Sequence, residues 1–376
     1  MQANASSRQG AGRTIGYAVV GIGHIAQVAV LPAFTHAKRN SRLVAIVSDD
    51  ARKRRELGRR YRVATYSYNE YGACLAHPDV DAVYIAVPNS LHARYAVRAA
   101  QGGVHVLCEK PMALDEDQCA SMIRAARQHR VKLMIAYRLH FEAANLRAAE
   151  VVRSGVLGEP RIFNSVFGMQ VTPGDVRLRR ALGGGTLYDV GIYCINAARS
   201  LFRDEPIEVS AFASHNGDRR FREVDEMTSA ILRFRDDRLA CFTSSFGAAD
   251  VAAYEVVGTK GRLRVEPAYE YAEGLTHYLT VNGREQRRTF PKRDQFAAEL
   301  LYFSDCILHD REPEPSGYEG LADVRIIRAL QRSAASRRPV KIRALGRRLR
   351  RPSMRQETHR PPVRKPRVVR ARPPSR

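Results

Sequence analysis

The sequence contains no tryptophan, and its six cysteines form no Cys-x-x-Cys pair. Such scattered cysteines argue against a disulfide framework and against a zinc site, so we expect reduced, mostly buried thiols and no bound metal. No run of 18 apolar residues occurs, which argues against a membrane-spanning helix. The first 13 residues are polar and lack the apolar middle of a secretory signal, so we expect a soluble, cytoplasmic protein.

Acidic residues are few beside the basic ones: 39 Asp and Glu stand against 62 Lys and Arg, which gives a net charge of +23. Much of the excess lies in residues 341–376, where fourteen basic residues face one acid, Glu357. This segment is also rich in proline and has almost no periodic apolar residues, so a disordered basic tail is predicted there. It could make weak contact with polyanions, but charge confined to a tail indicates neither a specific nucleic acid nor a membrane as partner.

The chain of 376 residues is long enough for two domains with separate cores. After a polar N-terminal arm, 1–13, continuous apolar strands alternate with helices through residues 14–137, which is typical of a doubly wound parallel sheet. Residues 138–340 change to strands with alternating apolar and polar residues. The predicted fold class is therefore α/β: an N-terminal Rossmann domain followed by an α+β domain with a large, open, mainly antiparallel sheet.

A short apolar run leads directly into Gly21-x-Gly23-x-x-Ala26, and a helical stretch follows. The first glycine permits a tight turn, the second lets the backbone approach a pyrophosphate, and the small third residue allows close helix packing. A strand before and a helix after are the context that this motif requires. We therefore expect a dinucleotide to bind at Gly21, Gly23, His24 and Ile25.

The predicted second strand ends in Ser48-Asp49-Asp50, with Arg52 and Lys53 close behind. An acid at this place would bind the 2′-hydroxyl of NAD, whereas a hydroxyl with nearby cations suits the 2′-phosphate of NADP. Ser48, Arg52 and Lys53 favour NADP, and Asp49 argues against it unless its side chain points away. A solvated helix start with Asp50 as N-cap would explain the same charges without a ligand.

Two more strand ends in the first domain carry polar residues. One apolar strand ends in Glu109-Lys110-Pro111, and because ligands bind beyond the carboxyl ends of parallel strands, Lys110 is placed for chemistry. A surface lysine beside a turn proline is the simpler alternative. The preceding strand is followed by Pro88, Asn89 and His92, of which Asn89 and His92 could line a nicotinamide pocket or only cap the next helix.

In the second domain, Gly183-Gly-Gly185 opens a predicted helix in which Asp189 and Tyr193 stand four residues apart. This spacing places the acid and the phenol on one face of the helix. Apolar residues can bury the other face, which would leave Asp189 and Tyr193 toward the cleft. An ordinary helix with a core tyrosine would show the same pattern.

Three motifs in order, Gly21-x-Gly23-x-x-Ala26, Glu109-Lys110-Pro111 and Asp189-x-Gly191-x-Tyr193, resemble the glucose-fructose oxidoreductase, inositol dehydrogenase and rhizopine catabolism (Gfo/Idh/MocA) family. The similarity spans about residues 15–341. Tyr193 stands in place of the histidine common elsewhere in the family, and together with segments 136–140 and 177–185 it resembles the glucose-fructose oxidoreductase branch.

The resemblance implies an α+β domain whose open sheet mediates dimerisation, so a homodimer or homotetramer is expected. It also implies a cis bond before Pro111 and a catalytic set of Lys110, Asp189 and Tyr193. By the same resemblance, Ser48 and Lys53 would contact the 2′-phosphate of the cofactor. The residues that would shape the nicotinamide pocket are Asn89, His92, Glu109 and Arg138.

We expect reversible hydride transfer between NADP, with NAD as the alternative cofactor, and a carbinol carbon of a sugar, polyol or aldose. A base must take the hydroxyl proton, and Tyr193 is the candidate because the Lys110 cation would stabilise its phenolate. Asp189 would hold a sugar hydroxyl and orient Lys110, which is itself an alternative proton carrier. Two other functions stay open: a non-catalytic nucleotide or sugar sensor, and an NAD-assisted glycoside-cleaving enzyme.

Overall fold

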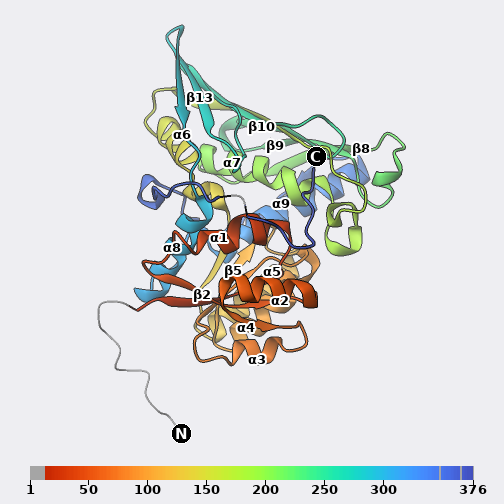
Figure 1. Ribbon diagram of the computed structural model, residues 1–376. Coiled ribbons are helices and arrows are strands. Elements are labelled where there is room, and N and C mark those ends of the chain that lie inside the picture. The colour runs from red at the N-terminus through yellow and green to blue at the C-terminus, as the bar shows by residue number, and fades with distance from the viewer. Residues whose placement is uncertain (1–12, 347–348, 365, 376) are drawn as a thin grey trace.

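The computed structural model describes residues 13–346, 349–364 and 366–375. Nearly all of the predicted N-terminal arm, 1–13, lies outside the described residues. Two sheets, one from each half of the chain, form the described structure, and helices lie between and around them (Figure 1). No helix among the residues described combines the length and the apolar character that crossing a bilayer requires.

The first sheet has six parallel strands, and its order reverses between β1 and β4. In spatial order the strands are β3 (Ala64–Tyr66), β2 (Ser41–Val47), β1 (Ile15–Val20), β4 (Ala82–Ile85), β5 (His105–Glu109) and β6 (Leu133–Ala136). This is the doubly wound order in which a dinucleotide binds at the point of reversal, beyond the carboxyl ends of β1 and β4. The predicted Rossmann sheet is confirmed.

Both faces of this sheet are buried, as its continuous apolar strands predict. Along β1, Ala18 and Val20 join the apolar cluster on one face, while Tyr17 and Val19 join the cluster on the other, because successive strand residues point to opposite sides. The helices that follow the strands are η1 (Ala26–Val30), α1 (Leu31–Ala33), α2 (Ala51–Tyr61), α3 (Tyr71–Leu75), α4 (His92–Gln101) and α5 (Glu116–Gln128).

A helix from the far end of the chain completes this core. The long helix α8 (Gln295–Leu308) packs against β1 and β2 of the parallel sheet. Its Ser304 hydroxyl lies 2.8 Å from the hydroxyl of Tyr17, and the main-chain oxygen of Leu301 accepts a 2.9 Å hydrogen bond from Asn40. The first domain is therefore assembled from both halves of the sequence.

The second sheet has nine strands, and all its pairs are antiparallel except β7 with β10. In spatial order they are β14 (Arg284–Phe290), β13 (Leu275–Val281), β12 (Gly261–Val265), β11 (Val251–Gly258), β7 (Pro160–Gly168), β10 (Leu239–Ser245), β9 (Met227–Arg233), β8 (Glu208–Ser214) and β15 (Val340–Lys341). The predicted large, mainly antiparallel sheet is thus confirmed. The edge strand β14 was not predicted, because nearly all its residues are exposed and polar and show no alternation.

Helices α6 (Ala143–Arg153), α7 (Ile192–Phe202) and α9 (Gly317–Ser336) cover one face of the nine-stranded sheet (Figure 1). The opposite face carries exposed apolar side chains on its central strands. They are Ile162, Phe212, Met227, Ile231 and Leu239.

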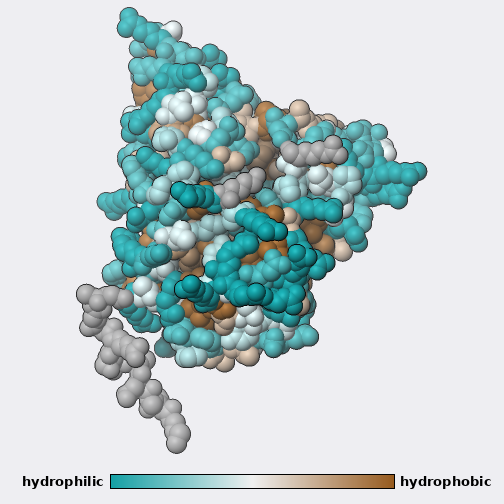
Figure 2. Space-filling view, in the orientation of Figure 1, coloured by the Kyte–Doolittle hydropathy of each residue, from teal (hydrophilic) through white to brown (hydrophobic). Residues whose placement is uncertain are grey.

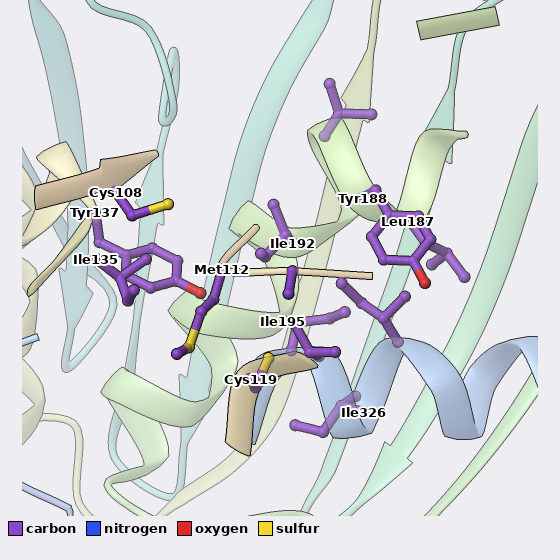
Figure 3. Close-up of a cluster of buried hydrophobic side chains, with 14 of the residues drawn as sticks. Cys108, Met112, Cys119, Ile135, Tyr137, Leu187, Tyr188, Ile192, Ile195 and Ile326 are labelled. Carbon is purple, nitrogen blue, oxygen red and sulfur yellow. The ribbon is translucent and has the colours of Figure 1, made fainter. Parts of the chain in front are cut away.

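An apolar cluster joins the two domains behind the predicted site. Figure 3 shows Met112 between Ile135 and Tyr137 on one side and Ile195 on the other. Met112 follows the Glu109-Lys110-Pro111 segment, whereas Ile195 belongs to α7, the helix that carries Tyr193. Because close-packed interiors move little, this contact fixes the position of Lys110 relative to α7.

The described part of residues 341–376 differs from the predicted disordered tail. In Figure 1 this dark blue segment runs across the front of the molecule, between the two sheets. Arg351 pairs with Glu205 at 2.5 Å and Glu319 at 3.4 Å, and the buried Gln356 donates a 2.7 Å hydrogen bond to Glu314. Composition shows the cations of the tail but not the carboxylates in distant parts of the fold that pair with them, so these contacts could not be predicted from the sequence.

Candidate active site

A cavity of about 700 Å³ lies between the carboxyl ends of the parallel strands and the second domain. All the predicted site residues except Arg52 line it, although they come from segments up to 172 positions apart, from Gly21 to Tyr193. They are Gly21, Gly23, His24, Ile25, Ser48, Lys53, Pro88, Asn89, His92, Glu109, Lys110, Arg138, Asp189 and Tyr193. The size and the mixture of apolar wall and polar groups are typical of a cofactor site.

The glycine turn fits a dinucleotide. Gly21 has a φ of +92°, and a Cβ atom there would lie 2.6 Å from the main-chain oxygen of Ala86, so no side chain is tolerated. A Cβ atom on Gly23 would meet nothing within 4 Å, because this residue faces the open cavity. The turn therefore presents bare backbone to the cavity, which is what close approach of a pyrophosphate requires.

At the end of β2, the two acids are directed away from the cavity. Asp49 accepts a 2.8 Å hydrogen bond from the backbone N–H of Tyr68 and does not line the cavity. Asp50 caps α2 by accepting hydrogen bonds of 3.0 and 3.1 Å from the N–H groups of the first helical turn, as the capping interpretation proposes. Ser48 and Lys53, by contrast, do line the cavity, and burial lowers the pKa of Lys53.

Arg52 was predicted to contact the cofactor, but the structure places it outside the cavity. Its guanidinium donates a 2.6 Å hydrogen bond to Glu56 on the exposed side of α2, outside the cavity. Adjacent helical residues point about 100° apart, and of these two it is Lys53 that faces the cleft. A cation that the sequence analysis missed, Arg370 of the tail, lies instead 3.6 Å from Asp50.

The three predicted catalytic residues converge from both domains. Lys110 follows β5, and a cis bond joins it to Pro111, as the resemblance implies. Its Nζ donates a 2.8 Å hydrogen bond to the main-chain oxygen of Asp189, lies 3.3 Å from the Asp189 carboxylate, and lies 4.5 Å from the ring centroid of Tyr193. Asp189 lies in η6 (Leu187–Gly191), the turn that leads directly into α7.

Opposite charges keep Lys110 and Asp189 ionised although both are largely buried. Burial opposes ionisation of Asp189, but Arg177 and Lys110 outweigh that effect and lower the pKa of the carboxyl to about 2. Burial likewise opposes the charge on Lys110, yet nearby Tyr193, Asp189 and Glu109 raise the pKa of the amine. At neutral pH the site therefore holds an ammonium against a carboxylate.

Arg177 is a site residue that the sequence analysis missed. Its Nε donates a 2.5 Å hydrogen bond to the Asp189 carboxylate, and it lines the same cavity. It lies in the irregular segment before the three glycines, where no helical or strand periodicity indicates which side chains face inward. Its only sequence signal was membership of the segment 177–185, which resembles the glucose-fructose oxidoreductase branch.

A second cation flanks the phenol. The Arg138 guanidinium lies 5.1 Å from the ring centroid of Tyr193 and 5.3 Å from that of Tyr271, and it donates a 2.8 Å hydrogen bond to Gln295. Tyr271 and Gln295 were also not predicted, since both belong to segments far from any motif. Arg138 and Lys110 thus place two positive charges beside the Tyr193 ring.

Glu109 lies deeper in the same wall. Its carboxylate accepts a 2.8 Å hydrogen bond from the hydroxyl of Tyr84, and burial raises the pKa of the carboxyl.

Asn89 and His92 do not cap the following helix, so the capping interpretation is wrong. Helix α4 has no side-chain cap. Asn89 donates a 2.8 Å hydrogen bond to the main-chain oxygen of Gly183, and the His92 ring nitrogens lie 2.8 Å from the oxygen of Pro111 and 3.0 Å from that of Val87. These bonds tie three loops of the cavity wall together. Long-range partners replace the local cap that residue type alone suggests.

The described residues contain no group of three or more His, Cys, Asp or Glu side chains that could hold a metal ion. All six cysteines are free thiols, and five of them are buried.

A parallel sheet of this order, a glycine turn open to a cleft, and an acid, an ammonium and a phenol at the far end of that cleft define a nicotinamide-dependent oxidoreductase. Residues 15–137 match the family described as "Oxidoreductase family, NAD-binding Rossmann fold", and residues 145–264 match the "GFO/IDH/MocA C-terminal domain". The chain belongs to the Gfo/Idh/MocA family, as its motifs predict.

Relatives agree over nearly the whole length of the chain. The chain is 30% identical to the D-xylose 1-dehydrogenase [NADP(+)] of Haloarcula marismortui over 335 residues. The matched region covers 87% of this chain and 92% of that protein. The crystal structure of the aldose-aldose oxidoreductase of Caulobacter crescentus, complexed with glycerol, has a TM-score of 0.84 at 39% identity and covers 88% of this chain and 100% of that one.

A third relative is a 3-ketoreductase from Actinomadura kijaniata, whose crystal structure contains NADP and TDP-benzene. Its TM-score is 0.78 at 28% identity, with 85% of this chain and 98% of that chain covered. This chain is thus an NAD(P)-dependent oxidoreductase of the same family, and the predicted enzyme class is confirmed.

Proposed function

We propose that this enzyme transfers hydride between NADP and a carbinol carbon of a sugar, either an aldose or a related polyol. The observation that carries the proposal is the convergence of Lys110, Asp189 and Tyr193 in the same cavity as the open glycine turn. The names of the relatives support a sugar substrate, since one acts on D-xylose and another is an aldose-aldose oxidoreductase.

Two observations favour NADP over NAD. Ser48 and Lys53 face the cavity where the adenosine ribose is expected, while the Asp49 carboxylate is occupied by the N–H of Tyr68. A hydroxyl and a cation suit a 2′-phosphate, and an acid turned away does not repel it. The NADP in the name of the Haloarcula relative and in the Actinomadura structure agrees with this assignment.

Gly21, Gly23, Ser48 and Lys53 would hold the dinucleotide, and Asn89, Glu109 and Arg138 line the end of the cavity assigned to the nicotinamide. When bound, the nicotinamide supplies the redox chemistry by accepting or giving a hydride. The remaining task of the protein is to bind the sugar and to move one proton.

Tyr193 is the group assigned to that proton. In the oxidative direction its Oη takes the proton of the sugar hydroxyl, and in the reductive direction it returns one. The ammonium of Lys110 and the guanidinium of Arg138, at 4.5 and 5.1 Å from the ring centroid, stabilise the phenolate that this role requires. Both cations are held in place by other contacts, so they cost no reorganisation at the moment of transfer.

The other two members of the set are less suited to accept the proton. Lys110 has a raised pKa, so it is protonated at neutral pH and acts as a cation. Asp189, with a pKa of about 2, is too weak a base, but its oxygens can accept hydrogen bonds from sugar hydroxyls while fixing Lys110 and Arg177. Geometry and charge together favour Tyr193 as the proton carrier.

The decisive experiment incubates the purified protein with NADP or NAD and a panel of aldoses and polyols, while the absorbance of the reduced nicotinamide is followed. Reduction of NADP by one class of sugar is the expected result. A sensor on this scaffold would bind nucleotide and sugar without turnover, and a glycoside-cleaving enzyme would release sugar without net reduction. Either of these outcomes would replace the proposed function.

We also propose a homodimer or homotetramer that forms through the nine-stranded sheet. Its open face presents Ile162, Met227, Ile231 and Leu239 beside Phe212, whose side chain is 74% exposed. Several exposed apolar side chains on one open face of a sheet are typical of a protein interface.

A cytoplasmic location is likewise a proposal. It is supported by the six free thiols, since reduced cysteines are the rule in reducing compartments. Fractionation of the source cells would test it.

A further inference from the structure

The last described residues of the tail, 366–375, form a strap that connects the two domains. At one end, the main-chain oxygen of Arg367 accepts a 2.6 Å hydrogen bond from Arg60 of α2. At the other end, Pro374 accepts a 2.9 Å hydrogen bond from the N–H of Thr172, and Ser375 forms an antiparallel bridge with Val171, beyond β7. Figure 1 shows this segment passing α1 and α2 before it rises to the second sheet.

The first domain binds the strap through a buried glutamine and an apolar contact. Gln27, only 1% exposed, accepts a 2.7 Å hydrogen bond from the N–H of Val369 and donates a 2.9 Å bond to its oxygen. The same amide nitrogen lies 3.2 Å from the main-chain oxygen of Ile22, in the middle of the glycine turn. Val369 itself is 4% exposed and belongs to the apolar cluster that includes Ile22. Without the strap, a buried amide oxygen would lose its donor, which is costly.

The strap also forms part of the cavity. Pro373, Pro374 and Ser375 line the same space as the glycine turn and Lys110. A ligand bound in the cavity would therefore contact the strap directly. The ligand would lie between the strap and the parallel sheet.

One strap residue adds charge at the adenosine end. Arg370 Nη1 lies 3.6 Å from the carboxylate of Asp50, the N-cap of α2, and its charge acts on Lys53. The Arg370 side chain is 62% exposed, so it can turn toward an anion at Ser48 and Lys53. Figure 2 shows hydrophilic side chains gathered over this part of the surface.

We propose that the strap is part of the cofactor site: Arg370 joins Ser48 and Lys53 in binding the 2′-phosphate of NADP, and the strap slows dissociation of the bound dinucleotide. The role of Arg370 rests on the proposed NADP function, whereas slower dissociation of the dinucleotide applies to either nicotinamide cofactor. Removing one positive charge from a phosphate site weakens binding of the phosphorylated cofactor only, so the role of Arg370 and the role of the strap can be tested separately.

The first test compares Arg370→Gln with Arg372→Gln. Both arginines are exposed and lie outside the cavity lining, but Arg370 lies beside Asp50 at the start of α2. Equilibrium binding of NADP and NAD is measured by titration calorimetry. We expect Arg370→Gln to raise the dissociation constant for NADP about fivefold and to leave that for NAD unchanged, with no effect of Arg372→Gln. Equal effects of both variants, or of Arg370→Gln on both cofactors, would overturn the role of Arg370.

The second test removes residues 366–376 and follows the release of NADPH and NADH by displacement. Faster release of both is expected, with the far-ultraviolet circular dichroism unchanged. If the shortened chain does not fold, limited trypsin digestion of the full chain decides: bound NADP should slow cleavage after Arg367 and Arg370, the strap arginines that are not followed by proline. Cleavage at the same rate with and without NADP would contradict the strap.

The two proposals fail in different ways. If the unaltered protein binds NAD as tightly as NADP, the NADP assignment fails. The role of the strap in retaining the cofactor is then still tested by the release rate of NADH from the shortened chain.

Discussion

Lys110 Nζ donates a 2.8 Å hydrogen bond to the main-chain oxygen of Asp189, a residue of the other domain 79 positions away in the chain. This contact joins the carboxyl end of β5 to the turn before α7, and it brings the ammonium to the ring of Tyr193. The site therefore exists only where the two domains meet. Four predictions follow from its geometry and from the surfaces around it.

Tyr193→Phe should lower kcat by ~100- to 10,000-fold, because the phenol is the assigned proton carrier. The dissociation constant for NADP should stay within about twofold, since the ring remains in place for packing. Steady-state kinetics and calorimetric titration measure the two quantities. Tyr271→Phe is the matched control, because that ring also lies beside Arg138 in the cavity, 5.3 Å from the guanidinium, but is assigned no proton. A near-normal kcat for Tyr193→Phe would remove it from the role.

Lys53→Ala should raise the dissociation constant for NADP by about tenfold and leave that for NAD nearly unchanged, because a cavity cation near the 2′-phosphate is lost. Arg52→Ala, one residue earlier, should change neither constant, since Arg52 pairs with Glu56 outside the cavity. Binding titrations with both cofactors measure the effect. Similar losses for the two variants would show that α2 acts only through its overall charge.

Asp189 should make folding stability depend on acid pH. Its folded pKa of about 2 lies below the ordinary value of 3.8, so its ionised form stabilises the fold above pH 4, and this stability is lost as the pH falls toward 2. The shift corresponds to about 2 kcal/mol of unfolding free energy. Urea unfolding should therefore show Asp189→Asn less stable than the natural protein at pH 5, with a smaller difference at pH 3. A constant difference would contradict the ion pairs with Lys110 and Arg177.

Phe212→Asp should shift the protein toward monomers, because it places a charge on the open apolar face of the nine-stranded sheet. Light scattering after size-exclusion chromatography measures the mass. Val156→Asp is the control, since Val156 is an exposed apolar residue in the turn between α6 and β7, outside that face. An unchanged mass for Phe212→Asp would place the interface elsewhere.

Local patterns predicted much of the fold and part of the site. The run of apolar strands, the glycine turn and the step from Glu109 to Pro111 are each set by neighbours in the sequence, so the parallel sheet and the place of Lys110 followed from them. Helical periodicity placed Asp189 and Tyr193 on one face. Strand β14 was not predicted because nearly all its side chains are exposed, so its sequence shows no alternation of apolar and polar residues.

By itself, then, the sequence determined a two-domain α/β protein with a dinucleotide turn, and it determined which side chains could do chemistry. Tertiary structure alone decided that Lys53 rather than Arg52 faces the cavity, that Asn89 and His92 bind distant carbonyls, and that Arg177 holds Asp189. It also decided that the basic tail lies along both domains, with Val369 buried against Gln27. The physical reason is that each of these groups meets a partner or a cavity wall formed by another segment of the fold, and local residue type and spacing contain no information about where that segment lies.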